Sequence, residues 1–393
     1  MIKFVYPFNS YDFCKYNQNE VTWTVSDEHD CWSLEWLLKQ VGIDYANIFK
    51  QSTDRCYIKF NLNLPTTYRD LNNLPEKIWK YIKNNDNVFL LLYQATEATP
   101  FYFYKPRWDN LKHFLLDREI PAEKIKFICG DIDATANHKS SFDAYWSGID
   151  VIGLNIFELI HYWRHFGHHA KIFHTECVNK YLSNLDKTKN FVNFNGRSRP
   201  NKQALLYYMN KANVTDQGFV SNLFDIEKDF IMTEYEFNKL YNIDNSEYGD
   251  FLNNIPKEIY LDNPECISAV SPDIYYYLSK FSLVSETYTG NNVRFITEKT
   301  YKPILMGHPF TVHGTTHTLE YLKEIGYLTF PEIFDESYDD DVDTKEQLRK
   351  NLNNLNAKFK IKKSLQKKLY HNQKHFLSLP SRSIIKDKLR IFL

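Results

Sequence analysis

An acid and a base, Glu298 and Lys299, stand side by side in "FITEKTYKPILMGHPF" (295–310), where a strand-like pattern changes to a helix-like one. Thr297 can cap a helix starting here, and Glu298 suits the first turn because a carboxylate complements the helix dipole. Lys299 opposes that dipole, so an anionic partner such as a ligand phosphate would explain its position. The alternative is a solvated surface lysine, which costs only about a few tenths of a kcal/mol.

A second group of cations lies in "NFNGRSRPNKQALL" (193–206), which reads as a strand, a polar turn and a helix. Pro200 takes the favoured early-helix position, and Arg197, Arg199 and Lys202 surround it. Backbone N–H groups at a helix start, together with guanidinium forks, make a site suited to phosphate. The alternative is a basic surface turn of the kind that often joins a strand to a helix.

Two further groups could hold metal ions. Four histidines occur in one short stretch: His161, His165, His168 and His169. No Cys or carboxylate completes a zinc set nearby, so we favour a polar helix face. Asp131 and Asp133 follow a predicted strand and could hold Mg²⁺ or Mn²⁺ on a diphosphate, although two carboxylates alone are a weak metal signal.

Two charged runs have ordinary interpretations. The acidic run Glu336–Asp343 is spaced faintly like a calcium loop but lacks the central Gly and the terminal Glu in register, so we interpret it as a solvated connection. The basic run Lys358–Lys374 could touch DNA or an anionic acceptor. For such a helix we favour packing of its Leu stripe on a domain, with the lysines left in water.

The composition is that of a soluble protein of about two domains, with 393 residues and a net charge of −1. This charge gives no global field that would recruit nucleic acid or a membrane. Six cysteines are scattered without a CxxC pair, which indicates reduced thiols in a reducing compartment. No signal peptide opens the chain, and no apolar run approaches the roughly 20 residues of a membrane span. We therefore expect a cytoplasmic protein.

Short apolar runs alternate with segments of helical periodicity along most of the chain. The first half predicts strands at 2–8, 87–93, 124–130 and 150–155, with helices at 33–42 and 107–117. The second half predicts strands at 189–195, 217–221, 280–286 and 308–314, with helices at 199–211, 297–306, 318–326 and 348–376. Strands separated by helices imply right-handed crossovers and parallel α/β sheets.

The pattern restarts near residue 180, which divides the chain into two α/β units. We predict an N-terminal domain at 1–185, a C-terminal domain at 186–345, and a helical basic tail at 346–393 that packs back on the domains. Two such units suggest a cleft between them. In open parallel sheets, ligands bind beyond the carboxyl ends of the strands.

The stretch 295–310 resembles the signature of the α-1,3-fucosyltransferases: an aromatic residue, Ile or Val, Thr-Glu-Lys, an apolar helix, then Gly and Pro with a strand. The form here is closer to fucosyltransferase-like proteins of phages and large viruses, which share a turn resembling 193–206. The resemblance covers roughly residues 190–345. It implies an α/β fold of the GT-B type, in which two Rossmann-like domains face a cleft and the C-terminal one holds the nucleotide-sugar donor.

The resemblance also implies donor-binding roles for residues of both motifs. Thr297 would belong to the donor site, Lys299 would bind the donor diphosphate, and Glu298 would contact the ribose or the sugar. Lys202 aligns with the family's basic phosphate ligand, where an Arg is usual, and Glu286 stands where the family has the Glu of a Phe-Glu-Asn segment. Lys is a point charge, so the bidentate fork would come from one of the two arginines of the 193–206 turn.

An inverting sugar transfer needs a carboxylate base to take the proton of the acceptor. Glu97, just after the predicted strand 87–93 of the N-terminal domain, is our candidate, with an exposed loop acid as the alternative. Trp23, Trp32 and Tyr93 are available to stack on an acceptor. The family's architecture usually works without a metal, so we expect no metal cofactor.

We therefore predict a glycosyltransferase, a hexosyl- or pentosyltransferase that moves a sugar from a GDP-fucose-like donor to a glycan or another hydroxyl. A viral or phage enzyme that glycosylates a hydroxylated DNA base is an alternative. A non-catalytic protein that binds nucleotides or carbohydrates is an alternative of another class.

Overall fold

The structure is a computed structural model of the whole chain. It describes residues 1–5, 34–48, 55–61, 76–95, 105–141, 144–163, 177–184, 186–196, 199–222, 233, 241, 245–254, 273–291 and 293–393. Contacts between residues divide the chain into two compact units. Unit 1 comprises Met1–Ile156 with Ser381–Leu393, and unit 2 comprises Phe157–Pro380.

This division differs from the predicted boundaries at 185 and 345. Helices α8 (Phe157–Trp163) and α9 (Cys177–Ser183) fall within unit 2, because α8 packs on α14 and α17, and α9 on α13 and α17. The predicted tail is also divided. Its first two helices, α16 (Thr344–Asn354) and α17 (Lys363–Leu377), belong to unit 2, whereas α18 (Ser381–Phe392) belongs to unit 1.

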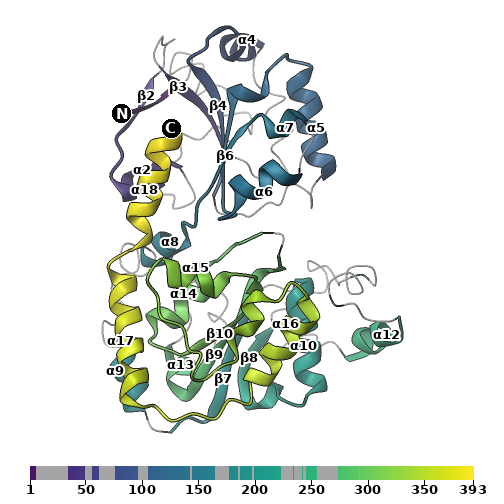
Figure 1. The fold of residues 1–393 in the computed structure, drawn as a ribbon, viewed down its shortest axis with the longest axis vertical. Helices are drawn as coiled ribbons and strands as arrows, with labels where there is room; N and C mark the ends of the chain where they lie inside the picture. Colours follow the sequence, from purple (N-terminus) through teal and green to yellow (C-terminus); the bar gives the residue numbers. More distant parts are fainter. Residues whose placement is uncertain are drawn as a thin grey trace. The chain divides into compact units, whose positions relative to one another are not determined.

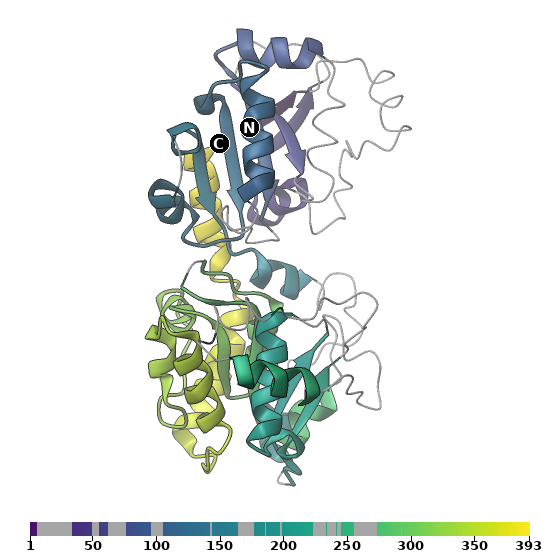
Figure 2. The same cartoon turned by 90° about the vertical axis from the view of Figure 1, so that its right-hand side faces the viewer.

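Unit 1 contains a six-stranded, wholly parallel sheet in the order β2-β1-β3-β4-β5-β6. Its strands are β1 (Ile2–Val5), β2 (Tyr45–Ile48), β3 (Cys56–Asn61), β4 (Val88–Gln94), β5 (Ile125–Cys129) and β6 (Asp150–Gly153). Its helices, besides α18, are α2 (Leu34–Val41), α4 (Glu76–Asn84), α5 (Lys105–Leu116), α6 (Ala134–Ser141) and α7 (Ala144–Ser147). Figures 1 and 2 show this sheet with helices packed against it.

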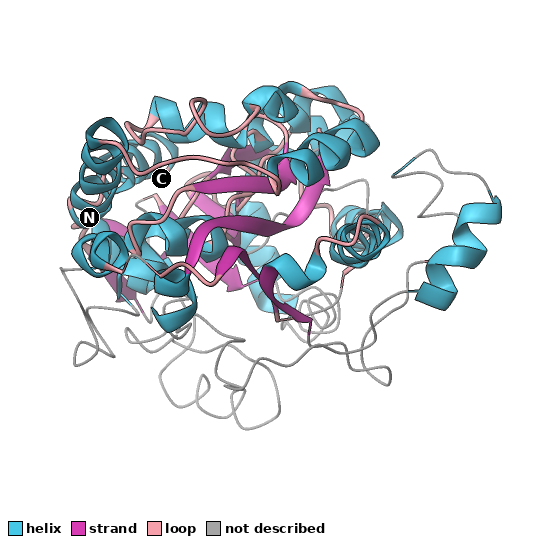
Figure 3. Ribbon diagram, turned by 90° about the horizontal axis from the view of Figure 1, so that it is seen from below, coloured by secondary structure: helices cyan, strands magenta, loops and turns pink. Residues whose placement is uncertain are grey.

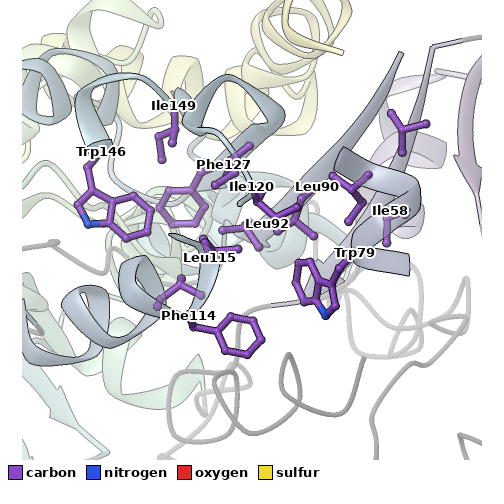
Figure 4. Close-up of a cluster of buried hydrophobic side chains, with 14 of the residues drawn as sticks. Ile58, Trp79, Leu90, Leu92, Phe114, Leu115, Ile120, Phe127, Trp146 and Ile149 are labelled. Carbon is purple, nitrogen blue, oxygen red and sulfur yellow. The ribbon is translucent and has the colours of Figure 1, made fainter. Parts of the chain in front are cut away.

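The core of unit 1 forms where the apolar faces of α4, α5 and α7 meet the sheet. Trp79 of α4 packs edge-on against Phe114 of α5, with ring centroids 5.4 Å apart. Trp146 of α7 meets Trp108 of α5 in the same way at 5.3 Å. Figure 4 shows Trp79, Phe114 and Trp146 around the buried leucines of β4, Leu90 and Leu92. The continuous apolar run at 87–93 thus forms the doubly covered strand that the sequence predicted.

Helix α18 completes unit 1 at its edge strand. The Lys388 ammonium donates to the carbonyl of Gly153 at 3.0 Å, and the Tyr57 hydroxyl donates to the carbonyl of Leu393. Gly153 must be a glycine, because a Cβ there would lie 1.8 Å from the carbonyl oxygen of Asp131. The last helix is therefore part of the N-terminal unit's packing.

Unit 2 contains a four-stranded parallel sheet in the order β10-β9-β7-β8. Its strands are β7 (Lys189–Asn195), β8 (Gly218–Asn222), β9 (Ser279–Gly290) and β10 (Phe310–Thr315). Its further helices are α10 (Pro200–Lys211), α12 (Asn245–Asn254), α13 (Asp273–Leu278), α14 (Glu298–Leu305) and α15 (Thr318–Glu324). Figure 3 shows helices on both sides of these strands.

The direction of strand addition reverses between β7 and β9. From β7 the chain passes through α10 to β8, and from β9 it passes through α14 to β10 on the opposite side of the sheet. Such crossovers are almost always right-handed, so the two helices must cover opposite faces. Accordingly, α10 packs against α16 and α14 against α17 (Figure 1). Ligands in open α/β sheets bind at a reversal of this kind, beyond the carboxyl ends of the strands.

The predicted α/β class with two Rossmann-like parallel sheets is confirmed. The acidic run after α15 is less solvated than we predicted. Asp339, in the 3₁₀ helix Glu336–Asp340, is buried and accepts hydrogen bonds from the N–H groups of Leu319 and Glu320 at 2.9 to 3.0 Å. It thereby satisfies the start of α15, whose own N-cap residue, His317, makes no side-chain cap.

Candidate functional site

The carboxylate of Glu286 lies at the centre of the site in unit 2. This side chain of β9 has no exposed surface. Its oxygens accept from the Thr297 N–H at 3.0 Å, the Thr297 hydroxyl at 2.6 Å and the Thr300 hydroxyl at 2.6 Å. We predicted a donor-binding role for Glu286. In the structure its carboxylate fixes the first turn of α14, which is a positioning contact.

Thr297 caps α14, as the sequence predicted. Its backbone is extended, with φ −111° and ψ −177°, and its hydroxyl oxygen accepts from the Lys299 N–H at 3.3 Å. The same hydroxyl donates to Glu286, so the cap is itself held by a buried carboxylate. Thr297 is buried, so its side chain shapes the site and presents little surface to a ligand.

Lys299 has an anionic partner within its own chain, which the dipole argument missed. Its ammonium lies 3.1 Å from the Glu298 carboxylate and 3.1 Å from the Thr297 hydroxyl. The Lys299 side chain is 25% exposed and that of Glu298 is 21% exposed, so both remain partly open to solvent. An ammonium has three N–H donors. Two are used in these contacts, which leaves the third for a ligand.

The pair is charged in the folded protein. Burial alone would raise the pKa of Glu298, but the ammonium groups of Lys299 and then Lys302 outweigh it and lower this pKa to about 2. Burial would lower the pKa of Lys299, but the carboxylates of Glu298 and Glu286 outweigh it and raise this pKa above its usual value. At neutral pH the first turn of α14 therefore presents an ammonium held by a carboxylate.

Helix α14 starts at Glu298 and runs to Leu305, with Pro303 inside it. A proline at this depth is expected to kink a helix or delay its start, but α14 starts directly after the Thr297 cap. Proline has no N–H, so the Lys299 carbonyl lacks its donor four residues later in the helix. A cavity of about 30 Å³ is lined in part by Ser285, Lys299, Lys302 and Pro303.

The start of α10 supplies the second half of the site. Pro200 is the first helical residue, as predicted, and Arg199 before it is extended. The Asn201 amide of the first turn donates to the backbone carbonyl of Glu286 at 3.0 Å. Glu286 thus holds the start of α14 through its carboxylate and the start of α10 through its backbone carbonyl. The two helix starts therefore meet where β7 ends beside β9.

Three predicted cations gather at these helix starts. Lys202 is buried, and its burial, followed by the charges of Lys299 and Arg199, lowers its pKa to about 7. The Arg199 guanidinium lies 6.0 Å from the ring centroid of Tyr288 on β9. The charges of Lys299 and Arg199 thus act on Lys202, and the carboxylates of Glu286 and Glu298 offset them only in part. Arg197, the fourth predicted cation, lies outside the described residues.

A polar network that we did not predict lies where the carboxyl end of β7 runs beside β9. The Asn193 amide donates to the Leu283 carbonyl at 2.7 Å and to the Ser285 hydroxyl at 2.8 Å. The Asn195 amide donates to Asn193 Oδ1 at 2.6 Å, and Asn195 Oδ1 is buried without a hydrogen-bond partner among the described residues. Two asparagines at period two in a buried strand were the available signal.

Several candidates elsewhere are resolved differently. The Asp131 carboxylate accepts from the Asp133 N–H at 3.1 Å and from the side-chain amide of Asn137 at 2.9 Å, so it holds the turn before α6. Tyr93 is buried in β4 and does not present its ring for acceptor stacking. Glu97, our candidate base, lies outside the described residues, as do Trp23, Trp32, His165, His168 and His169.

The described residues contain no group of three or more His, Cys, Asp or Glu side chains able to hold a metal ion. Within the same ranges, no helix is both long enough and apolar enough to cross a membrane.

Glu286→Gln tests the positioning role. An amide cannot accept from all the donors around this carboxylate, so we expect unfolding to become easier by about 1–3 kcal/mol, measured as a lower urea midpoint. Glu298→Gln, at a partly exposed neighbour, is the matched control and should shift the midpoint by less than about 1 kcal/mol. Equal midpoints for the Glu286 variant and the wild type would contradict the role.

No family model and no curated protein matches the chain. Among solved structures, it is similar to T4 phage BGT in complex with its UDP-glucose substrate, at 13% identity and a TM-score of 0.35, over 90% of each chain. A mutant of T4 phage BGT in complex with UDP-glucose gives 13% and 0.36, over 90% of this chain and 91% of that one. A crystal structure of an α1,3-fucosyltransferase gives 12% and 0.28, over 98% of this chain and 90% of that one. Such low identities and TM-scores establish neither a family nor an activity.

Proposed function

We propose that the protein is a glycosyltransferase that uses a nucleotide-diphosphate sugar, with the donor bound by unit 2 between the starts of α10 and α14. One observation carries the proposal: Arg199, Lys202 and Lys299 gather where the strand order reverses between β7 and β9. Reversals of this kind are where α/β sheets bind nucleotides. The resemblance of both motifs to the α-1,3-fucosyltransferases supports the same assignment.

The diphosphate is the part of the donor that these groups fit best. Both helix starts direct backbone N–H groups and the positive end of a helix dipole toward the same place. When the sugar leaves, the diphosphate gains negative charge, and fixed cations stabilise that charge in the transition state. Loss of one such interaction typically costs about two to three powers of ten in rate.

Glu298 serves a neighbouring part of the donor in this proposal. Its low pKa keeps it ionised, so it can accept a hydrogen bond from a ribose or sugar hydroxyl. The same carboxylate orients Lys299 toward the phosphates. Thr297 and Glu286 hold both residues at the start of α14.

The acceptor and the base belong to unit 1 in this proposal. Glu97, which follows β4, remains our candidate for the base that takes the proton from the acceptor hydroxyl in an inverting reaction. A glycan, another hydroxyl compound or a hydroxylated DNA base would suit this chemistry. The competing class is a nucleotide- or carbohydrate-binding protein without transferase activity, which would bind a donor but neither hydrolyse nor transfer it.

Donor binding is the direct test. We expect a GDP-, UDP- or ADP-linked sugar to raise the thermal midpoint, because a ligand at about a hundred times its Kd stabilises by about 2.7 kcal/mol. Lys299→Ala should weaken binding about tenfold to a hundredfold, since a charge-assisted hydrogen bond is worth about 1.5–3 kcal/mol. Lys323→Ala, at an exposed lysine of α15 paired with Glu336, is the control. The donor site would be refuted if none of these nucleotide-linked sugars bound, or if the Lys299→Ala variant bound them as tightly as the wild type.

Donor affinity should depend on pH through Lys202. Its pKa of about 7 leaves it neutral in the free protein at higher pH, whereas a bound diphosphate favours the ammonium. Binding must then take up a proton, so affinity should fall by up to about tenfold per pH unit above neutrality. Calorimetry in buffers of different ionisation enthalpy measures this uptake, and Lys202→Met should abolish it. A flat affinity from about pH 6 to pH 9 would rule out this linkage.

Glu97→Gln tests the base. Transfer should fall by about two to four powers of ten while donor binding stays unchanged, because a general base contributes about that much. Glu76→Gln, at an exposed acid that begins α4 in the same unit, is the control. Retained turnover by the Glu97 variant would assign the role of base to another residue.

A further inference from the structure

The stretch from Lys358 to Lys374 presents a cationic surface. Its local positive charge is not apparent from the net charge of the chain, which is −1. Residues 347–386 contain eleven Lys and Arg and no Asp or Glu. Protein surfaces usually intersperse charges of both signs. A segment with one sign only is a candidate binding surface.

Helix α17 separates its apolar and cationic residues onto opposite faces. Its buried residues are Leu365, Leu369, Asn372, Gln373 and Phe376. The opposite face carries Lys363, Lys367, Tyr370 and Lys374, which are exposed and spaced four, three and four residues apart. At 1.5 Å per residue this stripe is about 16 Å long. The helix thus packs through one face, as predicted, and presents the other as a straight row of cations.

The segment before the helix adds three more exposed lysines. Lys358, Lys360 and Lys362 are exposed and alternate with the half-buried Phe359 and Ile361. The Phe359 ring lies 6.4 Å from that of Phe281, which turns the apolar side chains inward and leaves the ammonium groups outside. We call the six exposed lysines Lys358, Lys360, Lys362, Lys363, Lys367 and Lys374 the lysine row.

None of the six has an ion-pair partner among the residues that the structure describes. Other cations of the same region do: Lys368 reaches Glu332 at 2.7 Å and Lys350 reaches Asp341 at 2.8 Å. Carboxylates on the neighbouring elements are thus used by these other cations. The lysine row therefore has no counter-charge among the described residues.

The start of α17 makes the arrangement unfavourable without a ligand. Lys362 is its N-cap residue and Lys363 its first residue, and no acid lies in the first turn. Cations oppose the positive end of the helix dipole, whereas an anion there would meet both the unpaired backbone N–H groups and the two ammonium groups. The helix start therefore favours an anion at the same place as the charge count does.

We propose that the lysine row binds the phosphodiester backbone of a nucleic acid. A backbone offers regularly spaced anions along a line, as the stripe requires, and lysines contact phosphates without reading sequence. A membrane surface fits less well, because Tyr370 is the one large apolar side chain exposed between residues 356 and 377. The proposal is independent of the donor site, since none of the six lysines belongs to it.

Binding to a short mixed-sequence DNA duplex, without donor, is the test. Lys363→Gln, Lys367→Gln and Lys374→Gln combined should weaken binding about a hundredfold in dilute salt. The slope of log K against log salt should become shallower by about three, since each phosphate contact contributes about 0.9. Lys358→Gln, Lys360→Gln and Lys362→Gln combined should have a similar effect. Two triple variants guard against a folding defect, which the thermal midpoint would also reveal.

The matched control removes the same charge elsewhere. Lys83→Gln, Lys211→Gln and Lys323→Gln combined replace three lysines that each face a carboxylate, and should leave duplex binding nearly unchanged. An equal loss in this control would overturn the proposal in favour of a non-specific charge effect. Binding to anionic vesicles with no binding to the duplex would overturn it in favour of a membrane. Lys299→Ala should leave duplex binding intact, which separates this result from the donor test.

Discussion

A single buried carboxylate determines the geometry of the candidate site. Glu286 accepts hydrogen bonds from the backbone and hydroxyl of Thr297 and from the hydroxyl of Thr300, and its own carbonyl accepts from Asn201. A charge that is removed from water is tolerated only when donors of this kind surround it. Because Glu286 needs these donors, it joins the starts of α10 and α14, which lie on opposite faces of the sheet, to strand β9. The positions of Lys299 and Lys202 follow from this arrangement.

The reversal of strand order explains why the cations lie at this place. Because β7 and β9 lead to helices on opposite faces, both helices start at the same edge of the sheet, and their positive ends come together. Lysine and arginine are the residues that local helix energetics favour least at such an edge. Several cations at helix starts, where the helix dipole disfavours them, mark a functional or strained site, because the chain gains no stability from placing them there.

Much of the fold could be predicted because helical and strand periodicities are local. The strand at 189–195 has its predicted bounds, and the predicted cap at Thr297 is present. The order of the strands and the extent of each unit could not be predicted, since they depend on pairing between distant segments. The role of Glu286 is of the same kind, because its partners lie 11 and 14 residues further along the chain. The pairing of Lys299 with Glu298 could not be predicted from helical spacing, because residues i and i+1 of a helix do not usually face each other.

Helix α18 has a consequence for the order in which the protein can form. Unit 1 begins at the first residue but takes its last helix from residues 381–393, where Lys388 binds the edge strand at Gly153. A ribosome therefore completes the whole of unit 2 before it supplies the segment that finishes unit 1. Until then, the nascent N-terminal sheet carries an edge strand that lacks this lysine, and such an edge can pair with other chains. The completion of unit 1 therefore depends on the prior synthesis of unit 2.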